Sequence, residues 1–413
     1  MRIAENDIFK GLLILSLGFY LSIIGFGENL LTGGGGGIES SKSGSIVNQI
    51  TGLSLLGICG ILVWKSRRLS IKNLIKIGWP IWILITYFIL SLQWSYAPAI
   101  SLRRVVALST MVVTCLLLVR LFEPVSLLRI LSNAIVLTVI LGLVYSIVVG
   151  ANISIGLTDR ASGFRGIFND KNAAARIYSY GVLLFVGLGR YKTKFDIFCL
   201  LLLVFAVAAS QSATAVVMSV FGSGLIILFK MFKGKNIQNN LLRFVLLIVV
   251  LCIGSYIVNI AYEYILGLLG RDPSLTNRSI IWSLIDPLID NEYLLGYGYG
   301  AFWVSEGAVP FIERWGFIGN AHSGYKEIML HGGIIGTCIL LFILGYQISK
   351  AIRVYISPYH SELSSFLLMM VLMQTVVNYI AYIIINHNSV DMFLYLICFF
   401  MICYQSQQSG RER

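Results

Sequence analysis

Charged residues are scarce in this sequence, and their scarcity decides the class of protein. Asp, Glu, Lys and Arg together make up 12% of the 413 residues, whereas hydrophobic residues make up 57%. The mean hydropathy is +0.83, which is outside the range of soluble globular domains of this length. We therefore expect an integral membrane protein.

The sequence also lacks the short motifs of metal-dependent and nucleotide-driven chemistry. It contains no DxD motif, no GxxxxGK[ST] phosphate loop, no HExxH and no clustered His and Cys ligands. The seven cysteines lie within apolar stretches and lack the paired spacing of a disulfide or a zinc site. We expect no disulfide, no metal and no cofactor, and both metal-dependent sugar transfer and nucleotide-driven transport lose support.

Long apolar stretches occupy most of the chain. A helix needs roughly 20 mostly apolar residues to cross a membrane, and about twelve stretches approach this length. They lie near residues 9–26, 46–64, 77–95, 104–122, 126–149, 172–189, 195–211, 212–229, 244–262, 324–348, 362–385 and 390–404. The predicted fold is all-α, a single polytopic membrane domain (residues 1–413) of about twelve transmembrane helices.

The positions of Lys and Arg predict how these helices are oriented, because short loops rich in these residues remain in the cytoplasm. The even-numbered connections contain KSRRLSIKNLIK (65–76), RYKTK (190–194), KMFKGK (230–235) and KAIR (350–353). Both termini are therefore predicted to be cytoplasmic. The net charge of +12 mostly reflects this asymmetry, so we expect no nucleic-acid partner.

One external segment, about residues 263–321, is much longer than an ordinary connection, and such loops are usually either functional or disordered. Its many aromatic residues, among them Tyr299 and Trp303, argue against disorder. These rings could anchor the loop at the membrane interface. Alternatively, some of them could stack on sugar rings.

Within this loop, TNRSIIWSLIDPLID (276–290) has its apolar residues on one helical face, which predicts an amphipathic helix on the outer membrane surface. Thr276 or Asn277 can cap this helix, so that Arg278 lies in its first turn. Free amides beside an arginine favour an anion, and a diphosphate fits the guanidinium fork. Alternatively, Arg278 only reaches toward lipid headgroups. Pro287 is expected to kink or end the helix.

A second external basic cluster, RASGFRGIFNDKNAAAR (160–176), precedes the sixth apolar stretch. Its charges are exceptions to the topology rule, and binding of a polyanionic lipid head would explain them. Gly163 and Gly166 would let the backbone approach such a ligand closely. Alternatively, the charges pair with Asp159 and Asp170 as a structural clasp. The candidate ligands are Arg160, Arg165, Lys171, Asn172 and Arg176.

Only four histidines occur in the chain, and His322 opens the tenth apolar stretch within NAHSGYKEIMLHGGIIG (320–336). We predict that it lies in the first turn of a helix at the outer membrane surface. The helix dipole there disfavours imidazolium and keeps the ring neutral, as a general base requires. Gly332 and Gly336 form a small-xxx-small pair that allows tight packing of this helix. Alternatively, His322 only caps the helix or contacts the interface.

Two other histidines bear on this site. His331 is expected to pack or bond within the helix bundle. His387 lies in a short external turn and is the other candidate on the outer side.

Three motifs together resemble the O-antigen ligase and polymerase superfamily of bacterial membrane glycosyltransferases. One is His322-Ser323, separated by nine residues from Gly333-x-x-Gly336. Another, SGFRGIFNDKNAAA (162–175), is similar to the external arginine motif of that family. The third is GRDPSLTNRSIIW (270–282) with LLGYGYGAFW (294–303), which resembles exopolysaccharide polymerases of the succinoglycan type.

The resemblance covers about residues 160–345, and the first four apolar stretches share only the topology. The chain departs from the family pattern at Asn277, because many relatives of the polymerase type have Gly before the loop arginine. The local backbone at Arg278 is therefore expected to differ.

The resemblance implies a glycosyltransferase whose donor is a glycan on undecaprenyl diphosphate, at the periplasmic face of the bacterial inner membrane. The long loop would then be periplasmic. By motif, Arg165 and Arg278 would hold the diphosphate and His322 would activate the acceptor hydroxyl. Further supporting residues would be Lys171, Asn172, Arg160, Ser323, Tyr299 and Trp303.

The acceptor separates two activities within the family. A polymerase would use another glycan chain and work with a chain-length regulator, whereas a ligase would use the lipid A core; both would contact membrane lipids. Glu327 and Glu313 remain open as nucleophiles. A transporter of lipid-linked glycans is the rival from another class. Such folds tend to show two similar halves, whereas the long loop occurs only once here.

Overall fold

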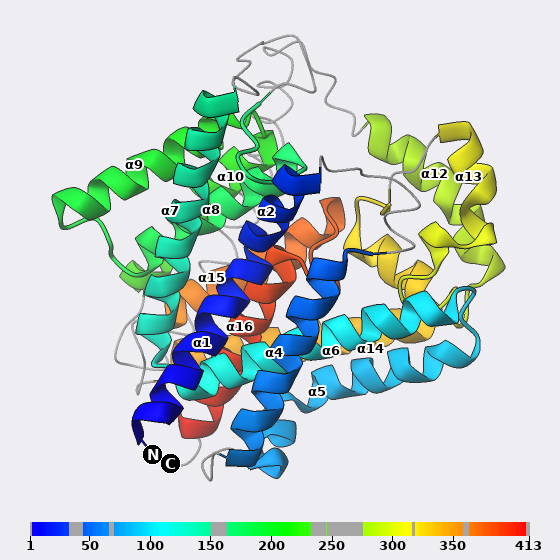
Figure 1. Cartoon of the computed structure of the whole chain (residues 1–413), viewed down its shortest axis with the longest axis horizontal. Helices are drawn as coiled ribbons and strands as arrows, with labels where there is room; N and C mark the ends of the chain where they lie inside the picture. Colours follow the sequence, from blue (N-terminus) through cyan, green and yellow to red (C-terminus); the bar gives the residue numbers. More distant parts are fainter. Residues whose placement is uncertain are drawn as a thin grey trace.

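A computed structural model describes residues 2–32, 44–65, 70–149, 163–232, 245, 276–315, 319–357 and 363–409 (Figure 1). Within these ranges the regular structure is helical and contains no β-strand. Arg160, Asp159 and the first part of the long loop lie outside the described residues.

The described helices follow one another along the chain with short 3-10 turns between some of them. They are α1 (Arg2–Tyr20), α2 (Ile23–Thr32), α4 (Ile46–Lys65), α5 (Ile71–Leu90), η1 (Ser91–Gln93), α6 (Pro98–Leu121), α7 (Pro124–Val149), α8 (Lys171–Gly187), α9 (Lys194–Ala209), α10 (Ala213–Phe232), α12 (Thr276–Asn291), η2 (Phe302–Val304), η3 (Glu306–Ala308), α13 (Val309–Trp315), α14 (Gly324–Ile356), α15 (Ser364–Ile380) and α16 (Val390–Ser409).

Several of these helices can cross a membrane, which makes the chain a multi-pass membrane protein. In the described ranges, seven are long and apolar enough: α4, α5 with η1, α6, α7, α10, α14 and α16. A helix lies at every predicted span within those ranges, although α8, α9 and α15 are shorter than a full span. The predicted span at 244–262 is outside them except for Val245. The total of twelve therefore stays a prediction.

Besides α14, which runs to Ile356 and so includes residues 350–353 that were predicted as a turn, two predicted spans differ in shape from the expectation. The first one consists of α1 and α2, because Ser22 has a φ of 60° and interrupts the helix. The other is α5, which begins at Ile71, within the segment predicted as a cytoplasmic turn. Ser70 is extended and precedes the helix, so this turn is shorter than predicted.

α16 is the central helix of the bundle. It packs against α5, α6, α8, α14 and α15, and Figure 1 shows it, in red, in the middle of the view. Its large side chains are buried, including Phe393, Phe399 and Phe400. By contrast, Trp64 of α4 and Phe198 of α9 are exposed, as is typical of lipid-facing positions.

A break in α14 anchors the loop that precedes α13. Gly333 has φ 57° and ψ −156°, which are not helical angles. Its neighbours bond to the loop instead: Ile334 N–H donates to Tyr293 O (2.8 Å), and Tyr297 N–H donates to Leu330 O (2.8 Å). These bonds satisfy backbone groups that the break leaves without a partner within the helix.

The predicted tight packing at Gly332 and Gly336 is confirmed, and the partner is Tyr87 of α5. A Cβ atom at Gly332 would lie 2.8 Å from Tyr87 Cε1, and one at Gly336 would lie 3.2 Å from it. The Tyr87 hydroxyl donates to Gly332 O (2.6 Å). Both glycines are therefore required by the close approach of two helices.

The described part of the long loop has a small hydrophobic core. It contains Ile285, Ile289, Tyr297, Phe302, Trp303, Ala308, Phe311, Ala321 and Leu330. The predicted helix at 276–290 is confirmed as α12, and its apolar face packs on this core; its place on the membrane surface stays a prediction. Pro287 does not end the helix, because α12 continues through it to Asn291, and a kink at this residue stays a prediction.

The break at Gly333 yields a prediction about stability. Gly333→Ala should destabilise the fold by roughly 1–3 kcal/mol or more, because its backbone angles are nearly restricted to glycine and a Cβ would lie 2.4 Å from Leu294 O. The melting temperature of purified protein in detergent measures this loss. Gly345→Ala in the same helix is the matched control, since no atom lies within 4 Å of its added Cβ. Equal melting temperatures for the two variants would contradict the prediction.

Candidate active site

His322 lies in a turn directly before α14, and not in the first turn of the helix as predicted. The reason is that Ser323, rather than Asn320, is the N-cap residue, with Oγ accepting from Lys326 N–H (3.5 Å). His322 has a φ of 50°, which residues other than glycine rarely adopt. Asn320 Oδ1 accepts a hydrogen bond from His322 N–H (2.9 Å) and stabilises this turn.

Charged groups from separate parts of the chain shift the pKa of the His322 ring. The residue is exposed to solvent on one side, yet neighbouring protein atoms desolvate the ring and lower its pKa below 6.5. Arg278 lowers the pKa further, Asp170 and Glu327 raise it, and Arg176 lowers it. Near pH 7 the ring is therefore mostly neutral, which suits a general base. The largest cause is desolvation, followed by the charge of Arg278, and the predicted contribution of the helix dipole stays a prediction.

Arg278 occupies the first turn of α12, as predicted, and its side chain is half-buried. One turn further along, Trp282 donates from Nε1 to Ala321 O (2.9 Å). This bond joins α12 to the residue before His322. The structure thus brings together an arginine and a histidine that the sequence separates by a helix and a loop.

Arg165 is exposed on a loop that is fixed by close backbone packing. Gly166 has a φ of 59°, and a Cβ on Gly142 of α7 would lie 2.5 Å from its Cα. The Tyr178 hydroxyl donates to Arg165 O (3.2 Å). At Gly163, with a φ of 133°, a Cβ would lie 2.5 Å from the backbone oxygen of the α9 cap residue. The glycines therefore serve contact with neighbouring helices, and their predicted close approach to a ligand stays a prediction.

Arg165 and Arg278 differ in their relation to His322. Arg278 shifts the pKa of the histidine, whereas Arg165 is not among the groups that do so. An electrostatic effect on His322 is thus established for Arg278, and the shared role of the two arginines stays a prediction.

The start of α8 differs from the predicted clasp. Asp170 caps α8, accepting from Ala173 N–H at Oδ1 (2.7 Å). Arg176 pairs with Asp391 of α16 through two hydrogen bonds, Nε to Oδ1 (3.2 Å) and Nη2 to Oδ2 (2.9 Å). The clasp with Asp170 was therefore wrong for Arg176, because the carboxylate that reaches it comes from a distant helix.

The supporting candidates Lys171 and Asn172 are the first two residues of α8. Lys171 is half-buried and Asn172 is exposed. They directly follow Asp170, the N-cap residue of α8, whose charge raises the pKa of His322.

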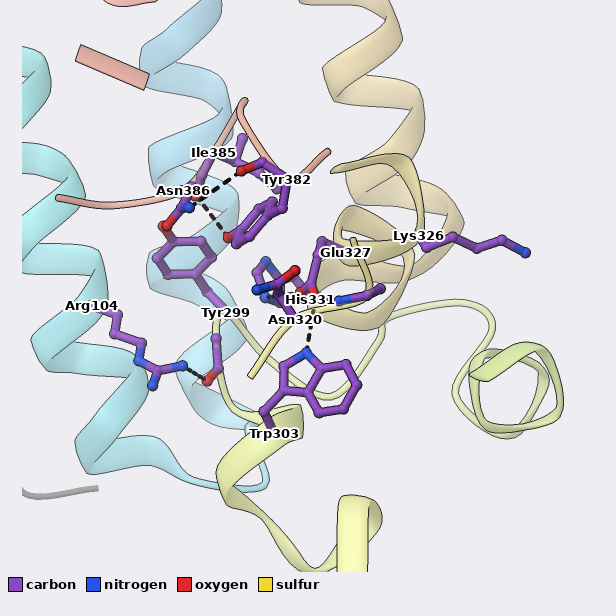
Figure 2. Close-up of polar contacts among 12 residues, drawn as sticks. Arg104, Tyr299, Trp303, Asn320, Lys326, Glu327, His331, Tyr382, Ile385 and Asn386 are labelled. Atoms are coloured by element: carbon purple, nitrogen blue, oxygen red, sulfur yellow. Dashed lines mark hydrogen bonds and ion pairs between the residues drawn. The ribbon is translucent and has the colours of Figure 1, made fainter. Parts of the chain in front are cut away.

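A buried network lies beneath the His322 turn. Glu327 is 0% exposed; its Oε1 accepts from Trp303 Nε1 (2.9 Å) and from Ala321 N–H, and its Oε2 lies 3.1 Å from His331 Nε2. Figure 2 shows the indole of Trp303 directed at this carboxylate. The prediction that His331 bonds within the bundle is confirmed.

Trp303 and Tyr299 are buried, so neither can stack on a sugar or anchor the loop at a membrane interface in this structure. Trp303 is 2% exposed and Tyr299 is 0% exposed. The Tyr299 hydroxyl donates to Ile385 O (2.8 Å) and lies 3.5 Å from His387 Nδ1. Both aromatic residues support the site from within. Tyr293, which is 51% exposed, remains available for either predicted role.

His387 is a weaker candidate for proton transfer than His322. Burial, followed by the charge of Arg104, lowers its pKa to about 3. It is therefore neutral near pH 7, but a base with so low a pKa holds a proton poorly.

Sequence reasoning missed the structural roles of Trp282, Glu327 and Asp391. A signal existed for both carboxylates, because each falls within a long apolar stretch, where charged residues are rare and usually functional. No local signal marks Trp282, because its partner Ala321 is 39 residues away.

Within the described ranges, no group of three or more His, Cys, Asp or Glu residues could hold a metal ion. The cysteines there are free: Cys59, Cys115, Cys199, Cys338, Cys398 and Cys403.

Two comparisons with known proteins bear on this site. Residues 198–342, which include Arg278 and His322, match the model of a family described as O-Antigen ligase. The chain is also 25% identical over 318 residues to the exopolysaccharide production protein ExoQ of Rhizobium meliloti (strain 1021). That similarity covers 72% of this chain and 70% of the relative. Arg165 precedes the segment that the family matches.

Proposed function

We propose that this chain, a member of the O-antigen ligase and polymerase superfamily by these similarities, transfers a glycan from undecaprenyl diphosphate to a sugar hydroxyl. The reaction takes place at the periplasmic face of the bacterial inner membrane, with both termini of the chain in the cytoplasm. The observation that carries the proposal is that the charge of Arg278 lowers the pKa of His322, which directly precedes the N-cap residue of α14 and is neutral near pH 7.

In the proposed reaction, His322 accepts the proton of the acceptor hydroxyl while the hydroxyl oxygen attacks the anomeric carbon of the donor sugar. The bond between that carbon and the diphosphate oxygen breaks, and undecaprenyl diphosphate leaves with the bonding electrons. Arg278 and Arg165 stabilise the charge on the leaving group through forked hydrogen bonds. A general base contributes roughly 10²- to 10⁴-fold to the rate.

The charge of Arg278 links donor binding to the base. Arg278 lowers the pKa of His322 in the free protein. A diphosphate bound to Arg278 offsets this positive charge, so the pKa of His322 rises toward its ordinary value. His322 therefore becomes a stronger proton acceptor when the donor is in place.

Direct displacement with inversion is the simplest stereochemistry for this arrangement. Glu327 is buried and its oxygens already bond to Trp303, Ala321 and His331, so it is poorly placed as a nucleophile. Glu313 is exposed on α13, and no contact in the described structure connects it with His322.

We favour polymerisation of repeat units over ligation to lipid A core, because the relative is an exopolysaccharide production protein by name. A polymerase binds two chains of the same repeat, one as donor and one as acceptor. A chain-length regulator is the partner expected for such an enzyme. The alternative is a ligase, and the family description favours it.

Reconstitution tests the class of activity. Purified protein in liposomes with a lipid-linked glycan should form a new glycosidic bond, detected by mass spectrometry of the products. His322→Ala should lower the rate by at least roughly 10²-fold, because the base is lost, without lowering the melting temperature. If wild-type protein only moves the donor between leaflets and makes no bond, the chain is a transporter.

The arginines can be tested by conservative change. Arg165→Lys and Arg278→Lys should each lower the transfer rate about tenfold or more, because lysine replaces the planar fork by a point charge. Arg353→Lys is the control, since Arg353 is exposed near the opposite end of α14. Full activity in both lysine variants would leave only nonspecific charge attraction as their role.

A metal-independent mechanism follows from the use of arginines to neutralise the diphosphate. Transfer by the purified protein should be unaffected by EDTA. A loss of activity with EDTA that Mg²⁺ or Mn²⁺ restores would overturn the scheme.

The lipid-linked products of a deletion strain distinguish polymerase from ligase. Loss of a polymerase should leave single repeat units on the lipid carrier, because no longer chain can be made. Loss of a ligase should instead leave long chains on undecaprenyl diphosphate. Extraction of the lipid fraction and separation by chain length measures the difference, and long lipid-linked chains would reject the polymerase.

A further inference from the structure

We infer that Trp282 and Glu327 are positioning residues: together they hold the backbone of Ala321 at its N–H and its C=O, and so fix His322 relative to Arg278. The consequence for transfer rests on the proposed function. The geometry itself can be tested without it.

Ala321 is the point at which the two residues meet. It is completely buried, and both of its backbone polar groups are bonded to side chains. Its N–H donates to Glu327 Oε1, and its C=O accepts from Trp282 Nε1 (2.9 Å). The next residue, His322, is exposed and has a φ of 50°. Such a conformation persists only where the surroundings hold it.

Glu327 can hold the N–H of Ala321 in one place because other side chains contact its own carboxylate. It is 0% exposed and is held by Trp303 Nε1 (2.9 Å) and His331 Nε2 (3.1 Å). A buried carboxylate that loses such partners is strongly disfavoured. The acceptor for Ala321 N–H therefore keeps one position relative to α14.

Trp282 connects the backbone of the same residue, Ala321, to the helix that carries the arginine. It lies four residues after Arg278, so the two side chains lie on the same face of α12. Its ring packs edge-on against Tyr379 of α15, with centroids 5.4 Å apart. A second link between α12 and α14 is the ion pair of Asp286 with Lys326. Of these two links, the indole N–H is the one that bonds to the backbone next to the histidine, so it should contribute most to the orientation of Arg278 relative to His322.

Catalytic groups must be held within roughly 0.5 Å of their productive geometry. A displacement of about 1 Å can cost about 100-fold in rate. Loss of the Trp282 bond should therefore lower kcat without removing any group that touches substrate. It should also let His322 move away from Arg278 and into solvent.

The first experiment titrates His322 directly. The rate at which diethyl pyrocarbonate modifies His322 is measured against pH by peptide mass spectrometry in wild type, Trp282→Phe and Trp94→Phe. Trp94→Phe is the matched control, because it removes another indole hydrogen bond to a carbonyl, on Leu295 (3.2 Å). The control should titrate like wild type.

In Trp282→Phe, the pKa of His322 should rise toward 6.5. Desolvation and the charge of Arg278 both lower it in the intact protein, and both weaken when the turn is released. The opposing charge of Asp170 and the further lowering charge of Arg176 come from α8 and its cap, which the substitution does not touch. The kcat for transfer should fall about 10- to 100-fold, with KM nearly unchanged.

The second experiment separates the position of Glu327 from its charge. Glu327→Gln keeps an oxygen that can accept from Ala321 and Trp303, so it should retain most of the transfer activity. Glu327→Ala removes the acceptor and should lose activity, with or without loss of the fold. An inactive but folded Glu327→Gln variant would overturn the positioning role, because a neutral isostere preserves the geometry.

The two hypotheses fail in different ways. If wild-type protein forms no glycosidic bond, the proposed function fails, and the titration of His322 still decides whether Trp282 positions it. If His322 titrates identically in wild type and Trp282→Phe, the positioning inference is overturned, even where transfer is normal in the wild type.

Discussion

The buried carboxylate of Glu327 is the interaction on which the geometry of the site depends. A carboxylate in an apolar interior is costly unless hydrogen bonds compensate for the lost water. Here Trp303 and Ala321 donate hydrogen bonds to one oxygen, and His331 Nε2 lies 3.1 Å from the other. One of these partners belongs to the same helix, one to the loop before α13, and one to the turn that carries His322. Satisfying a single charge therefore ties three parts of the chain together.

The break at Gly333 adds a second constraint on the same helix. Backbone groups that lose their helical partners need others in an apolar environment, and the segment 293–297 supplies them. The long loop is therefore anchored in the bundle rather than laid over it. That anchoring buries Tyr297, Phe302 and Trp303, and the small core they form gives α12 a surface to pack on.

The charges near His322 are arranged to keep its ring neutral and to leave one arginine beside it. Arg176 bonds to Asp391 of the central helix, so its charge is largely compensated. Arg278 is half-buried in the first turn of α12, where the positive end of the helix dipole also favours an anion. A diphosphate would meet the positive end of α12 and the histidine at the same point, as the proposed transfer requires.

The sequence by itself determined the features that depend on neighbouring residues. Apolar runs of sufficient length predicted the spans, and one-sided periodicity predicted α12 with Arg278 in its first turn. The His-Ser pair before an apolar run predicted the histidine at the start of α14, although the helix begins after Ser323 rather than near Asn320. Capping and hydropathy act over a few residues, so a local pattern is enough to identify them.

Only the tertiary structure decided which distant groups meet. Tyr299 and Trp303 could equally have faced lipid, sugar or protein, because an aromatic side chain suits all three. Glycines beside Arg165 could have served a ligand or a neighbouring helix. Trp282 and Ala321 are 39 residues apart, and Arg176 and Asp391 are 215 apart. Whether such pairs form depends on how the helices between them pack, and packing is a property of the whole bundle rather than of any segment of the sequence.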